Sequence, residues 1–151
     1  MNKYRTHNCN ELRKDNVNQN VILSGWINKK RDHGNLLFID LRDNYGVTQC
    51  IIEKENSNFL KLEKTQLETV ICVEGKVINR SIETINNDIP TGEIEVSISN
   101  FDILGECKEL PMPVFSDQEY AEEIRLKYRF LDLRRKKIHE NIILRSKVIA
   151  F

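Results

Sequence analysis

Three short apolar-rich runs separated by tight turns constrain the fold of this chain more than any other feature. The runs cover residues 20–31, 36–42 and 47–53, and the segments between them, Asp-His-Gly-Asn and Asp-Asn-Tyr-Gly, are rich in turn-forming residues. Such runs predict strands, and turns this short join antiparallel neighbours. We therefore expect an antiparallel meander over residues 20–53.

The second of these runs has an unusual outer face. Alternation places Leu37, Ile39 and Leu41 on one face of the strand, so Phe38 shares the opposite face with Asp40. A phenylalanine there is either a single exposed apolar residue, which is common, or a platform on which a flat ligand stacks.

The order of the remaining elements narrows the fold class. Residues 56–70 have apolar side chains at roughly helical spacing, residues 70–80 and 93–104 return to strand character, and 81–92 form a polar loop. Three strands, a helix and two strands is the order of the OB-fold, a mainly β, five-stranded barrel whose exposed face binds oligonucleotides. Other small β-rich domains share this order.

The character of the chain changes after Gly105. Residues 109–115, Glu-Leu-Pro-Met-Pro-Val-Phe, predict a proline-containing linker, and helical patterns follow over 120–131 and from 134 onward. The last pattern has an apolar stripe and no C-terminal cap. We therefore expect the chain to be a piece of a longer protein.

Composition excludes several function classes. Lys and Arg total 23 and Asp and Glu total 23, so any nucleic-acid site must come from a local patch rather than a basic overall field. The four cysteines form no C-x-x-C pair, and the histidines show no ligand spacing, which argues against a zinc site. No secretion signal or membrane span is recognisable, so we expect a cytoplasmic protein with reduced thiols.

Several polar residues on or near the predicted outer face are candidate nucleic-acid contacts. The basic triplet ending in Arg31 is either a solvated strand end or a phosphate contact beside Phe38. Gln49 is either a surface residue or a reader of an unpaired base edge, and Glu95 either surface charge or an acceptor for a cytosine amine. The basic segment 125–137 is either a solvated helical pair or an RNA-backbone contact.

Three stretches connect the chain to a known family. "LSGWINKKRDHGNLLFIDLRDNYGVTQC", "TGEIEV" and "RLKYRFLDLRR" resemble the N-terminal region of bacterial-type aspartyl-tRNA synthetases, in uninterrupted order over essentially the whole chain. The resemblance implies an OB-fold anticodon-binding domain at 1–105, a hinge at 106–118, and the start of a truncated class II α+β catalytic domain at 119–151.

The resemblance also assigns roles to individual residues. Phe38 matches the aromatic residue that stacks on the central anticodon base, Gln49 the glutamine that recognises that uracil, and Arg31 the arginine beside it. Glu95 matches the glutamate that recognises the third base, a cytosine. Two loop positions near the anticodon are matched by Arg80 and Asn86.

Three positions depart from the pattern or vary within the family. Ile78 and Thr84 stand where relatives can carry an arginine and an asparagine, which weakens the assignment of contacts in the loop. His33 stands where relatives specific for the aspartate tRNA often have leucine. It is either a polar turn residue or a mark of the relaxed type that also charges the asparagine tRNA.

The resemblance further implies that the catalytic residues lie outside this segment. We expect no catalytic, cofactor-binding or metal-binding residue here; ATP and Mg²⁺ would serve the full-length enzyme, a homodimer acting on tRNA(Asp) without membrane or DNA partners. Two alternatives remain. One is a stand-alone OB module that binds single-stranded nucleic acid, and the other is the equivalent domain of a lysyl or asparaginyl synthetase.

Overall fold

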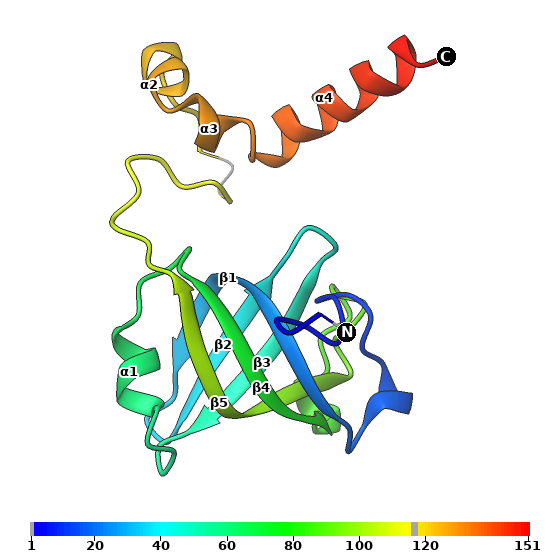
Figure 1. The fold of residues 1–151 in the computed structure, drawn as a ribbon, viewed down its shortest axis with the longest axis vertical. Helices are drawn as coiled ribbons and strands as arrows, with labels where there is room; N and C mark the ends of the chain where they lie inside the picture. The colour runs from blue at the N-terminus through cyan, green and yellow to red at the C-terminus, as the bar shows by residue number, and fades with distance from the viewer. Residues whose placement is uncertain (1, 116–117) are drawn as a thin grey trace. The chain divides into compact units, whose positions relative to one another are not determined.

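Five strands, joined by four antiparallel pairings and one parallel pairing, form the larger part of the molecule (Figure 1). In this computed structural model, residues 2–115 and 118–151 are described, and the chain divides into two units, Met1–Lys108 and Glu109–Phe151. The strands of the first unit are β1 (Asn20–Asp32), β2 (Leu36–Arg42), β3 (Val47–Glu53), β4 (Val70–Asn79) and β5 (Ile94–Gly105).

The strands close into a barrel in the order β1-β2-β3-β5-β4. The long strand β1 pairs with both β2 and β4, and the barrel closes where β3 meets β5 in parallel. That closure is short, with Cys50 opposite Val96 and Ile51 opposite Ser97. The mainly β OB-fold architecture, with a helix between the third and fourth strands, is therefore confirmed.

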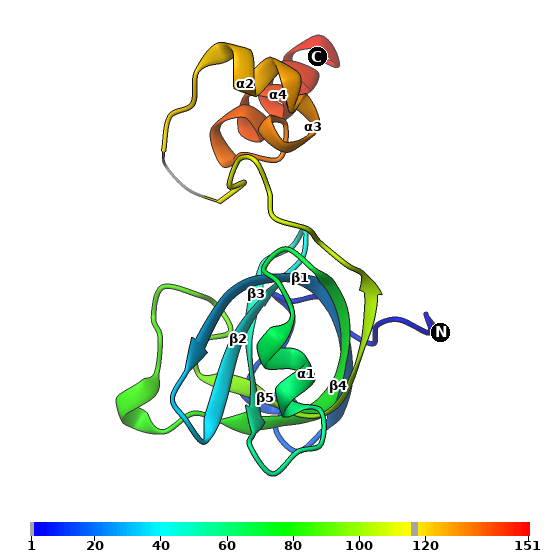
Figure 2. The same ribbon diagram turned by 90° about the vertical axis from the view of Figure 1, so that its left-hand side faces the viewer.

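The barrel interior is filled by the alternating apolar residues of all five strands. The predicted inward row of β2 is buried: Leu37, Ile39 and Leu41 are each at most 2% exposed. Helix α1 (Phe59–Lys64) lies across one end of the barrel, where Phe59 and Leu62 complete the core (Figure 2). Burial of this apolar surface is the main force holding the strands together.

The predicted helix over 56–70 is much shorter in the structure. The helix ends at Lys64 because Thr65 is already extended, with φ −67° and ψ 134°, and Glu68 adopts a positive φ of 64°. Two carbonyls at this end, those of Glu63 and Thr65, accept hydrogen bonds from the ammonium group of Lys30. The backbone after Lys64 then runs into β4.

The second unit has three helices and a small core of its own. The helices are α2 (Glu122–Lys127), α3 (Arg129–Asp132) and α4 (Lys136–Ile149). Met112 and Val114, which lie within the predicted hinge, are buried against Leu131, so this part of the segment packs as a portion of the second unit. Residues 116–117 of that hinge lie outside the described residues.

A buried carboxylate organises the short helices of this unit. Asp132 is fully buried and accepts hydrogen bonds from Arg125 and Arg129, while Arg135 lies 3.9 Å away as a third cation. The single predicted helix over 120–131 is broken at Tyr128. In residues 2–115 and 118–151, no helix is both long enough and apolar enough to cross a bilayer.

Candidate nucleic-acid interface

The outer face of β1, β2, β3 and β5 carries most of the residues that the sequence singled out. Cross-strand pairing places Arg31 opposite Phe38, and Asp40 opposite Gln49. Because side chains alternate across a strand, Phe38 and Asp40 point away from the buried row of β2. The predicted sharing of one face by an aromatic ring and a carboxylate is therefore confirmed.

Phe38 forms an aromatic pair with His33 beside the β1–β2 turn. The two rings are 5.2 Å apart between centroids and meet edge to face at 80°. Gly34 gives the turn its shape, with φ +80°, and its N–H donates to the Asp32 carboxylate at 2.7 Å. The phenyl ring is half-buried, so part of it is available for stacking a base.

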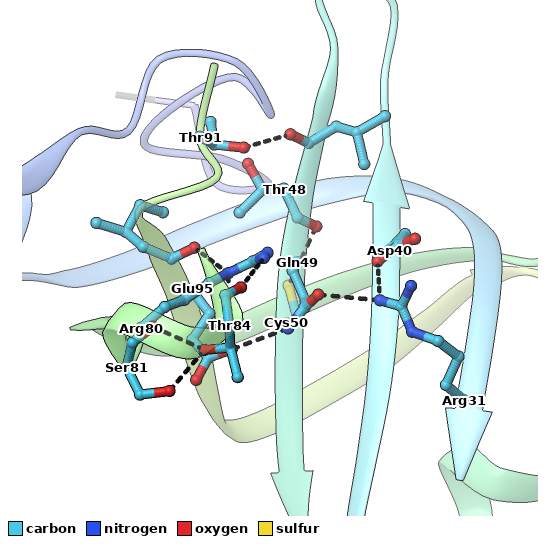
Figure 3. A network of polar contacts seen from close by, with 12 residues as sticks. Arg31, Asp40, Thr48, Gln49, Cys50, Arg80, Ser81, Thr84, Thr91 and Glu95 are labelled. Carbon is cyan, nitrogen blue, oxygen red and sulfur yellow. Dashed lines mark hydrogen bonds and ion pairs between the residues drawn. The ribbon is translucent and has the colours of Figure 1, made fainter. Parts of the chain in front are cut away.

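A chain of polar contacts crosses the sheet from Phe38's neighbours to β5 (Figure 3). The Arg31 Nη2 atom donates to Asp40 Oδ1 at 2.8 Å and to Gln49 Oε1 at 2.9 Å. Gln49 Nε2 in turn donates to Glu95 Oε2 at 2.9 Å. The network therefore joins residues of four strands, and it sits on the face predicted for base binding.

The exposed fraction of the network differs sharply among its members. The Arg31 side chain is 46% exposed, whereas that of Asp40 is 15% exposed, and Gln49 as a residue is 8% exposed. Only the outer edge of the network is therefore open to a ligand. Gln49 still has one N–H and one lone pair beyond those used within the network, because an amide offers two of each.

Arg80 closes the other side of the network from the end of β4. Its Nε donates to the carbonyl of Ile94 at 3.1 Å and its Nη1 to that of Thr84 at 3.2 Å, while Glu95 Oε2 lies 3.9 Å from Nε. Burial lowers the pKa of Arg80, and the Glu95 carboxylate opposes this shift. Within the described part of the chain, the buried Nη2 has no hydrogen-bond partner.

An unsatisfied buried guanidinium nitrogen is expensive, since each such donor costs about 1–3 kcal/mol or more. Native proteins keep such groups mainly where a ligand, an ion or water completes the hydrogen bonding. The Nη2 of Arg80 is such a buried donor, and the same guanidinium lies near Glu95 through its Nε, 3.9 Å from Oε2.

The loop between β4 and β5 has a defined backbone. Asn86 Oδ1 accepts from the N–H of Asp88 at 2.9 Å, and a Cβ on Gly92 would lie 1.6 Å from the carbonyl oxygen of Asn86. Thr91 anchors the loop to β3 through the carbonyl of Val47. Of the hydrogen bonds among residues 2–115 and 118–151, none joins the Asn86 side chain to the network around Gln49.

The basic triplet at the end of β1 divides into different roles. Arg31 belongs to the network, but Lys30 turns the other way and binds the carbonyl oxygens at the end of α1. Burial lowers the pKa of Lys30, and Glu63 opposes this. Lys30 is therefore a structural residue, which the adjacent positions in the sequence do not reveal.

One residue of the site was missed by the sequence assignment. Asp40 was placed on the correct face but given no role, although its carboxylate holds Arg31 against Gln49. Asp40 lies directly opposite Gln49 in the β2–β3 ladder, and this cross-strand pairing could have predicted its place in the site.

Comparisons with known proteins identify the same fold. Residues 21–104 match the family model described as "OB-fold nucleic acid binding domain". The chain is 76% identical over 151 residues to an Aspartate--tRNA(Asp/Asn) ligase of Pelagibacter ubique, and 53% identical to one of Parvibaculum lavamentivorans. These matches cover 100% and 99% of this chain but 25% of each relative. The chain thus spans about a quarter of the length of the curated relatives it matches.

Solved structures show the same fold. The asparaginyl-tRNA synthetase of Pyrococcus horikoshii, complexed with asparaginyl-adenylate, superposes with a TM-score of 0.78 at 25% identity, over 95% of this chain and 32% of that one. An aspartyl tRNA synthetase from Entamoeba histolytica superposes with a TM-score of 0.73 at 18% identity, over 86% of this chain and 32% of that one. The second likeness supports the fold alone.

Proposed function

We propose that this chain, which belongs to the family of OB-fold nucleic acid binding domains, is the anticodon-recognition region of an aspartate–tRNA ligase. In the proposed whole enzyme, ATP and Mg²⁺ serve to attach aspartate to its tRNA in the cytoplasm, and two copies form a homodimer. The residues that bind ATP and Mg²⁺ are expected in the part of the enzyme that this chain does not match.

One observation carries the proposal: a half-buried phenyl ring on β2 lies two residues along the β2–β3 ladder from an amide whose donor and acceptor are both held in place. Phe38 supplies a stacking surface, and Gln49 offers one N–H and one lone pair to the edge of a stacked base. Uracil carries a carbonyl acceptor next to its N3–H donor, which complements this pair. The central uracil of the anticodon is thus the proposed ligand of this site.

Glu95 and Arg80 extend the proposed site toward the third anticodon base. The Glu95 carboxylate accepts hydrogen bonds, and cytosine presents an exocyclic amine to such an acceptor. Arg80 lies beside this carboxylate, with its Nε 3.9 Å from Glu95 Oε2. We place Asn86 at the edge of this region, in the loop that Gly92 and Thr91 fix.

Recognition of both the aspartate and the asparagine tRNA is the proposed specificity. The two anticodons differ only at the third base, and the histidine at position 33 resembles the residue of synthetases with relaxed tRNA specificity. Relatives that are 76%, 53% and 52% identical to this chain bear names that include both tRNAs. Charging of both tRNAs by the full-length enzyme would support relaxed specificity, and strict preference for the aspartate tRNA would contradict it.

The alternatives have less support. A stand-alone single-strand binder explains Phe38 and Arg31 but not the similarity that continues through residues 109–151. A lysyl or asparaginyl synthetase domain shares the fold, yet identity to the asparaginyl enzyme is 25%, against 76% to the aspartate ligase.

RNA hairpins that differ only in their anticodon loop test the proposal. We expect the 151-residue chain to bind the hairpin with the aspartate anticodon more tightly than one in which cytosine replaces the central uracil. Fluorescence anisotropy with end-labelled hairpins measures both affinities at one stated salt concentration. Equal affinity for all loop sequences would contradict the proposal and favour a single-strand binder without base selectivity.

A further inference from the structure

We propose that Asp40 is a positioning residue for base recognition, which acts by fixing the orientation of the Gln49 side-chain amide through Arg31. The inference rests on the proposed function, because it specifies how the same face tells one base from another. It starts from a single nitrogen atom, Arg31 Nη2, and from the two acceptors that share it.

Arg31 Nη2 carries two hydrogens and has two acceptors. One is Asp40 Oδ1 at 2.8 Å and the other is Gln49 Oε1 at 2.9 Å. The Asp40 carboxylate is 15% exposed, so water competes little for its hydrogen bond with Arg31. Because Asp40 engages one hydrogen, the other is directed at Gln49. Without Asp40, the 46% exposed Arg31 side chain would be free to turn into solvent.

The Gln49 amide is held at both ends by groups of opposite character. Arg31 can only donate, so it requires the amide oxygen, and the ionised Glu95 carboxylate can only accept, so it requires the amide nitrogen. A rotation of the amide by a half-turn would place an N–H against the guanidinium and an oxygen against the carboxylate. Both hydrogen bonds would be lost, so the order of donor and acceptor is fixed.

This fixed order separates uracil from cytosine. At positions 4 and 3 of the pairing edge, uracil offers an acceptor and then a donor, whereas cytosine offers a donor and then an acceptor; both bases have an acceptor at position 2. An amide that rotates freely satisfies either base, while a locked amide leaves the wrong base unpaired. Stacking on Phe38 accepts both bases, because every base has a face to stack. Selectivity between the two bases therefore depends on the fixed orientation of the Gln49 amide, and that orientation depends on Asp40 through Arg31.

The experiment compares the affinity ratio for hairpins with a central uracil and a central cytosine. We expect Asp40→Ala to lower this ratio on the order of tenfold, within the range expected for one ordered base contact. Asp102→Ala, which removes an exposed carboxylate from β5, is the matched control and should leave the ratio unchanged. If Asp40→Ala fails to fold, Asp40→Leu has a side chain of similar length without an acceptor and should lower the ratio in the same direction.

A second background separates positioning from a general structural effect. In Gln49→Ala, the amide is gone, so adding Asp40→Ala should leave the ratio unchanged. An equal loss in both backgrounds, or a loss of affinity for both hairpins with no change of the ratio, would overturn the role of Asp40. If the wild-type chain itself fails to distinguish the hairpins, the proposed function fails, which is a different result from failure of Asp40 alone.

Discussion

Two arginines on the barrel, Arg31 and Arg42, each pair with a carboxylate, but their surroundings differ. Arg42 binds Glu68 at 2.9 Å and Asn28 at 2.7 Å, and its side chain is 7% exposed. Its guanidinium also lies 5.6 Å from the centre of the Trp26 ring. Arg31 pairs with Asp40 at a similar distance, 2.8 Å, yet remains 46% exposed.

The difference separates an ion pair that is enclosed within the fold from one that is open to the proposed ligand. Arg42 and Glu68 are enclosed together, so they hold the end of β2 to the segment before β4. Arg31 is half-exposed, lies opposite Phe38 in the β1–β2 ladder, and donates to an amide with unused hydrogen-bonding capacity. The same residue types therefore do different work, and the distinction lies in their neighbours rather than in their chemistry.

Replacing the enclosed arginine should have the largest effect. Arg42→Ala removes the guanidinium that pairs with the mostly buried Glu68 carboxylate, and breaking such a pair is expected to cost about 3–5 kcal/mol of unfolding free energy. Urea denaturation followed by circular dichroism measures this loss. Arg31→Ala is the matched variant and should cost less, because the Arg31 side chain is 46% exposed and water can take its place beside Asp40. Similar destabilisation by both variants would contradict the division between the two clusters.

Replacing the aromatic residue should affect binding instead of stability. Phe38→Ala is expected to weaken binding of the aspartate-anticodon hairpin by about 1–3 kcal/mol, the usual contribution of one stacked base. The urea midpoint should move much less than in Arg42→Ala, because the ring is only half-buried. Anisotropy titrations measure the affinity. Unchanged affinity in a folded Phe38→Ala variant would place the bound base elsewhere.

The smallest effect is expected within the basic triplet. Lys30→Met removes the ammonium group that binds the carbonyls at the end of α1, at a cost of about 0.3–1 kcal/mol in stability. Hairpin affinity should stay near the wild-type value, because Lys30 faces the helix rather than the network. The measurement compares the urea midpoints and hairpin affinities of Lys30→Met and the control variant Lys29→Met. A large loss of affinity for Lys30→Met would mean that the triplet acts as one phosphate-binding patch.

The regular parts of the fold were predictable from the sequence because strand alternation has a period of two. Leu37 and Ile39 had to be buried if Phe38 was exposed, and the turns at 32–35 and 43–46 fixed the order of the meander. The closing contact of β3 with β5 was not visible, since it depends on residues far apart in the chain.

The polar interior of the site was less predictable. Periodicity placed Asp40, Gln49 and Glu95 outward, but it does not state which donor meets which acceptor. The buried Arg80 guanidinium donates to two backbone carbonyls, those of Ile94 and Thr84, which only the folded loop brings together. Helix α1 ends early because Thr65 is already extended, and Glu68 further on is left-handed, features that apolar spacing does not encode.

The side-chain amide signal of Gln49 in a ¹⁵N–¹H NMR titration tests the central claim most directly. Its two hydrogens are inequivalent, one held by Glu95 and the other facing the proposed base. On addition of the aspartate-anticodon hairpin, we expect the Gln49 signal to shift while the amide of Asn28, beside Arg42, stays in place. Shifts at Asn28 with none at Gln49 would contradict the assignment of this face.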